Sequence, residues 1–192
     1  MTERWGKNAL LEQWHADGLT TVFGNPGTVE QGLLDALEHH PGFRYVLGLQ
    51  ETVAIGIADG YARATAGPAL VQLHTGVGLG NGIGMLYQAM RGHSPLVVIA
   101  GEAGVKYDAM DSQMATDLVA MARPVTKYAT RVTHPDSLLR VMRRAVKTAM
   151  TEPRGPVFVA LPMDVLDAVN TEYAVRSTIP SRAVRPVPDE LD

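Results

Sequence analysis

Cysteine is absent from the 192 residues of the sequence. Disulfide bonds, zinc sites built on thiolates, iron–sulfur clusters and catalysis by a thiol are therefore excluded. A chain without cysteine also suits a reducing compartment, so we expect a cytoplasmic protein. The histidines show no spacing that is typical of a metal site, and we expect no metal ligands in this chain.

The sequence is also poor in charge and has no long hydrophobic run. Charged residues make up 19% of the chain, the net charge is −3 and lysine and arginine form no long run, which predicts no nucleic-acid partner. Apolar stretches such as residues 96–100 are far shorter than the roughly 18 residues of a membrane span. Residues 1–7 lack the apolar core of a signal peptide. We therefore expect neither membrane insertion nor export, and the low charge indicates a surface that meets another protein.

What the sequence does contain is an alternation of short, β-rich apolar segments with amphipathic helical segments. Several of the short segments are apolar at consecutive positions, as in strands that helices cover on both faces. Helical spacing of apolar residues is clear around Leu10, Leu33 and Leu138. The pattern predicts a three-layer α/β/α domain with a central, mostly parallel six-stranded sheet. The expected strands are residues 20–23, 43–49, 69–73, 96–100, 125–128 and 157–161.

Length and proline content set the expected domain boundaries. At roughly 100 to 200 residues per domain, the chain holds one sizeable domain. Pro180, Pro186 and Pro188 lie among small and charged residues near the end of the sequence. We therefore predict a domain over residues 1–170 and a linker over residues 171–192.

The residues that follow the predicted strands are the candidates for a site, because ligands of open parallel sheets bind beyond the carboxyl ends of the strands. Four such junctions are unusual. They hold Asn25, Pro26, Gly27 and Thr28 after the first strand, Glu51 after the second, His74 and glycines at alternate positions from Gly76 to Gly84 after the third, and Glu102 after the fourth.

Each of these features has a structural interpretation beside the functional one. Thr28 and Gln31 form a T-x-x-Q capping box, which would start a helix. Glu51 suits the first turn of a helix, or serves as a carboxyl group whose apolar neighbours favour its protonated form. His74 is either a structural residue at a strand end or an acid/base group. Glycines 76–84 do not have the spacing of a dinucleotide-binding fingerprint, which leaves close approach to a ligand or tight packing.

Five ordered segments together resemble the pyrimidine-binding, N-terminal domain of thiamine diphosphate-dependent decarboxylases and carboligases. The resemblance covers about residues 8 to 168, and the sequence is similar to benzoylformate decarboxylases and to acetolactate synthase-like proteins in particular. It implies the thiamine diphosphate-binding fold, a 2-keto acid substrate, and decarboxylation or carboligation. The segments are VFGNPG (22–27), QE with ADGYAR (50–63), the run 74–81, SPLVVIAG (94–101), and GPV with LP (155–162).

The resemblance also implies roles for the candidate residues. Glu51 would hydrogen-bond the pyrimidine nitrogen N1′ and favour the tautomer whose 4′-nitrogen deprotonates the thiazolium ring. His74 would transfer protons to the substrate-derived intermediate. Thr28, which stands where benzoylformate decarboxylases have serine, would lie beside the substrate. The expected cofactor contacts are Asn25, Pro26, Gly27, Glu51, Gly78 and Asn81.

By the same resemblance the chain supplies only half of an active site. The family holds the diphosphate and its magnesium ion in a separate domain with a G-D-G…N motif, which the sequence lacks, and forms the site between subunits. We therefore expect a diphosphate-binding domain as partner, a homo-oligomer such as a homodimer, and no activity of the chain alone. The alternatives are a non-catalytic dimerisation or regulatory module with this fold, and the small subunit of a naturally split decarboxylase.

Overall fold

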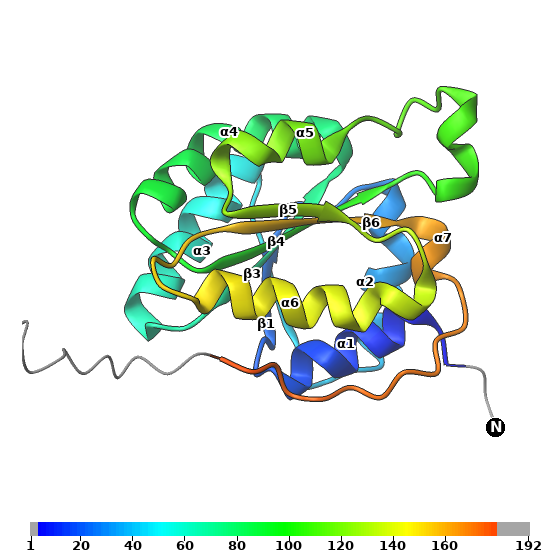
Figure 1. Cartoon of the computed structure of the whole chain (residues 1–192), viewed down its shortest axis with the longest axis horizontal. Helices are drawn as coiled ribbons and strands as arrows, with labels where there is room; N and C mark the ends of the chain where they lie inside the picture. Colours follow the sequence, from blue (N-terminus) through cyan, green and yellow to red (C-terminus); the bar gives the residue numbers. More distant parts are fainter. Residues whose placement is uncertain (1–3, 180–192) are drawn as a thin grey trace, which may run out of the picture.

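The computed structural model describes residues 4–179, which form a three-layer α/β/α domain (Figure 1). Its central sheet is parallel throughout, and the strand order is β2-β1-β3-β4-β6-β5. The predicted α/β/α architecture with a six-stranded sheet is confirmed. The strands are β1 Thr21–Gly24, β2 Arg44–Leu47, β3 Ala69–His74, β4 Leu96–Glu102, β5 Tyr128–Arg131 and β6 Val157–Pro162.

Helices cover both faces of the sheet (Figure 1). The connections between parallel strands are all right-handed. A connection that leads toward one side edge of the sheet therefore crosses one face, and a connection that leads toward the other side edge crosses the opposite face. Accordingly, α2 and α6, which lead to β2 and β6, share one face with α1 and α7, whereas α3, α4 and α5 occupy the other. In the described part of the chain, no helix is both long and apolar enough to span a membrane. The α-helices are α1 Gly6–Ala16, α2 Gln31–Glu38, α3 Glu51–Thr65, α4 Thr75–Arg91, α5 Leu118–Ala122, α6 Leu138–Met150 and α7 Met163–Leu166, and the 3₁₀ helices are η1 Thr28–Glu30, η2 Val105–Met110, η3 Arg123–Val125 and η4 Pro135–Ser137.

The hydrophobic core lies in two layers, one on each face of the sheet. Every residue of β4 and β6 is buried, because successive side chains point into opposite layers and both layers are covered by helices. In β6, for example, Val157 and Val159 enter the layer beneath α6, whereas Phe158 enters the layer beneath α4 and α5. This double coverage explains the consecutive apolar residues of the predicted strands.

The fifth strand is displaced from its predicted position. The sequence predicted a strand over residues 125–128, but β5 begins only at Tyr128. Residues Arg123–Val125 instead form η3, which contains Pro124 in its first turn, and Val125 is buried by packing beneath α5. A proline has no N–H for a strand ladder, so the chain turns here before it enters the sheet.

Glycines 76–84 lie inside α4, where the sequence pattern predicted no helix. Each glycine weakens a helix by about 1 kcal/mol relative to alanine, so local propensity disfavours this element. Tertiary packing overrides that preference: a Cβ on Gly82 would overlap Ile55 of α3, and the bare backbone therefore lets α4 lie close against α3. The tight-packing interpretation of the glycines is thus correct for Gly82.

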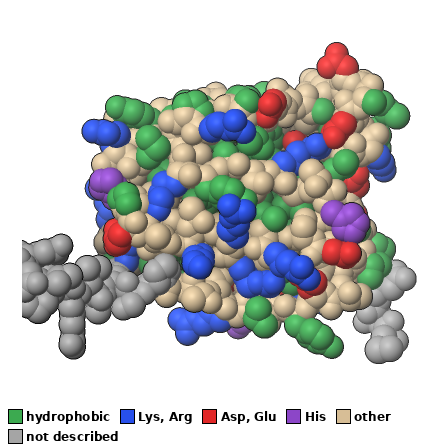
Figure 2. All heavy atoms as spheres, in the orientation of Figure 1, with side chains coloured by type: hydrophobic (Ala, Val, Ile, Leu, Met, Phe, Trp, Pro, Cys, Tyr) green, Lys and Arg blue, Asp and Glu red, His purple; other side chains and the backbone are tan. Residues whose placement is uncertain are grey.

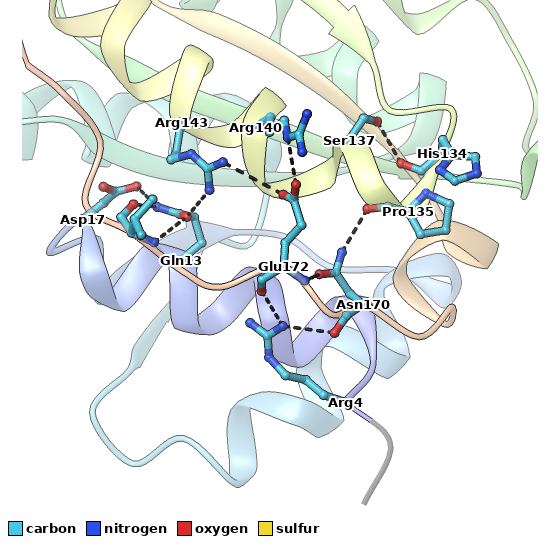
Figure 3. A network of polar contacts seen from close by, with 11 residues as sticks. Arg4, Gln13, Asp17, His134, Pro135, Ser137, Arg140, Arg143, Asn170 and Glu172 are labelled. Atoms are coloured by element: carbon cyan, nitrogen blue, oxygen red, sulfur yellow. Dashed lines mark hydrogen bonds and ion pairs between the residues drawn. The ribbon is translucent and has the colours of Figure 1, made fainter.

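The segment after α7 runs along the surface of α1 (Figures 1 and 3). Gln13 Nε2 of α1 donates to the carbonyl oxygen of Val175 at 2.7 Å, and the Ser177 N–H donates to Asp17 Oδ1 at 2.6 Å. The first part of the predicted linker is therefore attached to the domain. Residues 180–192, which contain its three prolines, lie outside the described residues.

Candidate functional site

The predicted site residues follow three neighbouring strands at the carboxyl edge of the sheet. In the order β2-β1-β3, the chain continues into α3 after β2, into η1 and α2 after β1, and into α4 after β3. Helices α2 and α4 lie on opposite faces. A parallel sheet opens a crevice at the point where its connections leave on opposite faces, and ligands of such folds bind there.

Glu51 is the first residue of α3 and is almost buried, with 8% of its surface exposed. The helix begins here because the preceding residue, Gln50, caps it: Gln50 Oε1 accepts the Thr52 N–H at 2.6 Å and the Val53 N–H at 3.3 Å. The carboxylate therefore lies at the positive end of the α3 dipole, and the cap fixes its position.

Two residues of α4 surround the Glu51 carboxylate. Asn81 Nδ2 donates to Glu51 Oε2 at 3.0 Å, and Thr52 Oγ1 donates to the Asn81 carbonyl oxygen at 2.6 Å. A Cβ on Gly78 would lie only 3.1 Å from Glu51 Oε1, so glycine leaves this oxygen uncovered. Among residues 4–179, none donates a hydrogen bond to Oε1. Glu51 Oε1 is free, and the contact of Asn81 with Oε2 holds the carboxylate in place. A ring nitrogen of a flat ligand can therefore hydrogen-bond Oε1, because Gly78 leaves room for the ring beside the α4 backbone.

A second polar group links the ends of β1, β3 and β4. His74 Nδ1 lies 2.8 Å from Glu30 Oε2, which also accepts the Gly27 N–H at 2.9 Å. The other oxygen, Oε1, accepts the Gly101 N–H at 2.9 Å. Glycine is required at position 27, because a Cβ there would overlap the His74 ring. Glu30 is only 2% exposed, so its buried carboxylate connects the ends of β1, β3 and β4 through these three contacts.

Burial dominates the electrostatics of this second group. It raises the pKa of the Glu30 carboxyl, and the hydrogen bond from Gly27 and the interaction with His74 offset only part of that effect. Burial, followed by the negative charge of Glu30, also raises the pKa of Tyr45, whose hydroxyl group donates to Gln72 Oε1. The carboxyl group is therefore suited to carry a proton that it shares with His74 Nδ1.

His74 is positioned by an unusual backbone turn. The next residue, Thr75, is buried and has a φ of 46°, in the left-handed region that residues other than glycine rarely adopt. Such strained residues cluster at functional sites, where the surrounding structure holds them in place. Glu30 occupies Nδ1 of the ring, and no described residue forms a hydrogen bond with Nε2. Nε2 is therefore the nitrogen available for exchange with a ligand.

The predicted capping box of Thr28 and Gln31 is wrong. A 3₁₀ turn begins directly after Gly27, which brings the side chain of residue 30 back to the N-cap in place of residue 31. The Thr28 hydroxyl group is exposed and lies 3.5 Å from Met114 Sδ. Thr28 therefore follows Gly27 as an exposed residue and does not cap a helix.

The remaining predicted residues occupy the loop between β1 and η1. Asn25 and Pro26 are half-buried there, and the Asn25 N–H donates to the Gln72 carbonyl oxygen at 3.3 Å. The structure thus brings the predicted residues together in two groups, Glu51 with Gly78 and Asn81, and Gly27 with His74. The two groups adjoin through the first turn of α4, because His74 directly precedes that turn and Gly78 lies in it.

Glu30, the buried centre of the second group, was not predicted from the sequence. The signal was present, because a glutamate three residues after an N-cap is the second half of a capping box. With Thr28 as the expected N-cap, the expected capping partner three residues later was Gln31. The actual N-cap is Gly27, so the partner is Glu30.

Glu102, the candidate at the end of β4, belongs to a separate ion-pair cluster. It is buried against the Arg131 guanidinium, which also pairs with Asp108 at 2.7 Å. Burial raises the pKa of Glu102, and the hydrogen bond from Arg131 opposes that effect. Glu102 is thus accounted for as one partner of a structural ion pair.

Comparisons with known proteins show the family to which the chain belongs. A model of the family described as "Thiamine pyrophosphate enzyme, N-terminal TPP binding domain" matches residues 4–121. Benzoylformate decarboxylase of Pseudomonas aeruginosa is 40% identical over 159 residues, which are 82% of this chain and 30% of that protein. The large subunit of acetolactate synthase isozyme 3 of Escherichia coli is 32% identical over 179 residues, which are 93% of this chain and 30% of that protein. The chain thus spans about a third of the length of these curated relatives.

Solved structures show the same fold. The thiamine diphosphate-dependent 4-hydroxybenzoylformate decarboxylase of Rhodococcus jostii superposes with a TM-score of 0.91 at 32% identity, covering 98% of this chain and 36% of that one. The benzoylformate decarboxylase of Polynucleobacter necessarius gives a TM-score of 0.91 at 33% identity, covering 98% of this chain and 35% of that one. The chain therefore belongs to the thiamine pyrophosphate enzymes, as a member of their N-terminal TPP binding domain family.

Proposed function

We propose that the chain is the pyrimidine-binding half of a thiamine diphosphate-dependent 2-keto acid decarboxylase or carboligase. The observation that carries this proposal is the Glu51 carboxylate, fixed by Asn81 on one oxygen and left open by Gly78 on the other. The relatives named benzoylformate decarboxylase and acetolactate synthase support the reaction class.

Glu51 acts on the pyrimidine ring in this proposal. When bound, thiamine diphosphate supplies a nucleophilic carbon and an electron sink for the loss of carbon dioxide from a 2-keto acid. Glu51 Oε1 holds the proton at the pyrimidine nitrogen, while Asn81 keeps the carboxylate from turning away. The bare backbone at Gly78 lets the ring lie close to this carboxylate.

In this proposal, His74 and Glu30 take part in proton transfer to and from the substrate. Nε2 of His74 exchanges a proton with the substrate-derived group, and Glu30 holds the imidazole through Nδ1 at 2.8 Å. Because burial favours the protonated Glu30 carboxyl, this pair can store a proton at the strand ends. The Thr28 hydroxyl group lies beside the substrate. The methyl group of threonine leaves less room for the substrate than a serine at this position would leave.

A partner domain holds the diphosphate and its magnesium ion in this proposal. The family's G-D-G…N motif for these groups is not in the sequence. The diphosphate-binding domain therefore approaches the carboxyl edge of the sheet, where Glu51 and His74 lie. This arrangement makes the chain inactive by itself and active in the complex.

Mixing the chain with the diphosphate-binding domain of a relative tests the proposed reaction. With thiamine diphosphate and magnesium, we expect the complex to release carbon dioxide from benzoylformate or to convert pyruvate to acetolactate, whereas either component alone does neither. Product analysis by mass spectrometry distinguishes decarboxylation from carboligation. A complex that binds the cofactor but consumes no 2-keto acid would instead identify a non-catalytic module.

We further propose that α3 and α4 form the contact with a second copy of the chain. Large apolar side chains are exposed at helical spacing along α3, where Val53 is 51%, Ile57 42% and Tyr61 39% exposed. On α4, which packs against α3, Val77 is 71% and Tyr87 49% exposed. Contiguous apolar surface on a soluble domain marks an interaction site. The Glu51 site lies at the end of the same two helices, so a partner on this face completes its surroundings.

Ile57→Asp is expected to weaken this association at least tenfold, because it would bury a charge in the contact. Sedimentation equilibrium of the chain measures the shift from dimer to monomer. Tyr173→Asp is the matched control, since Tyr173 is 88% exposed on the segment after α7, and it should leave the association unchanged. A wild-type chain that stays monomeric at high concentration contradicts the assignment.

A further inference from the structure

A basic cleft lies on the face of the molecule that α6 forms. Figure 2 shows Lys and Arg side chains gathered on this face. The cleft has a volume of about 810 Å³ and runs between the C-terminal half of α6, the loop that follows it, and the segment at Val175–Thr178. Five basic side chains line it, namely Lys127, Arg143, Arg144, Lys147 and Arg176.

Charge in this cleft is one-sided. Glu152 is the only carboxylate among its described lining residues. Among the described residues, Arg143 is the one lining cation with an ion-pair partner, since its Nη2 lies 3.9 Å from Glu172 Oε2. Such a concentration of like charge repels itself and is stabilised by an anion.

Contacts hold two of the arginines in place. Arg143 Nη1 donates to Gln13 Oε1 at 3.1 Å (Figure 3). The Arg144 guanidinium carbon lies 4.7 Å from the centre of the Tyr128 ring. A guanidinium held in this way is ready to bind an oxyanion, because less of its conformational freedom is lost on binding.

The other three cations of the cleft differ in their contacts. Lys127 is engaged, since Nζ donates to the Thr148 and Thr151 carbonyl oxygens at 2.8 and 2.6 Å. The side chains of Lys147 and Arg176, by contrast, are exposed and pair with no residue in the described range 4–179. Exposed apolar groups of Pro153 and Val175 line the same cleft and offer a surface for the organic part of a ligand.

The cleft is distinct from the site at Glu51 and His74. Lys127 precedes β5, so the cleft lies toward the amino end of that strand, whereas Glu51 and His74 follow the carboxyl ends of β2 and β3. A ligand in the cleft therefore does not compete for the pyrimidine site.

We propose that this basic cleft binds a small phosphorylated molecule that carries at least two phosphate groups. Arg144, Lys147 and Arg176 meet the phosphates, since guanidinium and ammonium groups are the common phosphate donors in proteins. Arg143 shapes the inner wall. The cleft is open to solvent, and its volume is within the range of small-molecule sites.

Titration calorimetry with pyrophosphate, ADP, AMP and adenosine tests the proposal on the 192-residue chain. We expect ADP and pyrophosphate to bind, AMP to bind more weakly, adenosine not to bind, and added salt to weaken binding. Tighter binding of ADP than of pyrophosphate identifies an organic phosphate as the ligand, and equal binding identifies the phosphates alone as the recognised group.

Lys147→Ala and Arg176→Ala should each weaken ADP binding roughly tenfold, as expected for loss of a charge-assisted hydrogen bond. Both side chains are exposed, so the variants should fold as the wild type does, which circular dichroism checks. Arg44→Ala is the matched control, because Arg44 is an exposed arginine of β2 outside the cleft. Absence of ADP binding at millimolar concentration, or equal weakening by all three variants, overturns the proposal.

Discussion

Glu51→Gln should slow proton exchange at C2 of bound thiamine diphosphate by about 100-fold or more, while the cofactor stays bound. The amide keeps the size of the side chain, and its oxygen can still accept the hydrogen bond that Asn81 Nδ2 donates at 3.0 Å. Its NH₂ group then replaces Oε1 and can donate to a ring nitrogen, but it cannot give up and recover a proton. Deuterium exchange followed by NMR, in the complex with a diphosphate-binding domain, measures the rate.

Glu38→Gln is the control for this substitution. Glu38 is an exposed residue at the end of α2, so the same chemical change there should leave the exchange rate unaltered. If Glu51→Gln exchanged as fast as the wild type, Glu51 would serve only to start α3, as the helix-dipole interpretation holds.

Glu30→Ala should lower the free energy of unfolding by about 3 kcal/mol or more, at roughly 1–3 kcal/mol for each buried partner left unsatisfied. The substitution removes the acceptors of the Gly27 and Gly101 N–H groups and the partner of His74 together. Glu30→Gln should cost less, because its oxygen can accept from Gly101 and its NH₂ group can donate to His74, which leaves only the Gly27 N–H without an acceptor. Urea denaturation compares the variants, and Glu38→Ala should change stability by less than about 0.5 kcal/mol.

The pH dependence of this difference follows from the raised pKa of Glu30. The folded protein holds the Glu30 proton more tightly than the unfolded chain does, because the Glu30 pKa is raised from its ordinary value of 4.5. The stability that this adds is fully present below pH 4.5 and is lost as the pH rises through the raised pKa. Gln at position 30 does not titrate, so the deficit of Glu30→Gln should narrow as the pH rises. A deficit that widens with pH contradicts the assigned direction.

The fold was predictable from the sequence in those segments where burial requires apolar residues. Strands β3, β4 and β6 are covered on both faces, so their apolar runs identified them. Helix α4 was not predictable from local preference, since glycine disfavours a helix and the element is stabilised by tertiary packing, which includes the close approach of Gly82 to Ile55 of α3. The start of β5 was misplaced because Val125 is apolar and buried outside the sheet.

The site was predictable in part, because the carboxyl ends of parallel strands meet at one edge whatever the details of the fold. That rule pointed to Glu51 and His74 as candidates, and both residues lie at this edge in the structure. It could not identify Glu30, whose role depends on a 3₁₀ turn that shifts the cap by one residue. Nor could the sequence reveal the basic cleft, since Lys127, Lys147 and Arg176 come from three separate segments that only the folded chain brings together.

A crystal structure of the chain with a diphosphate-binding domain and thiamine diphosphate would show where the pyrimidine ring binds relative to Glu51. We expect pyrimidine N1′ to lie at hydrogen-bond distance from Glu51 Oε1, roughly 2.6–3.2 Å, with the ring beside the Gly78 backbone. A pyrimidine ring bound away from Glu51, with Oε1 facing solvent, would contradict it.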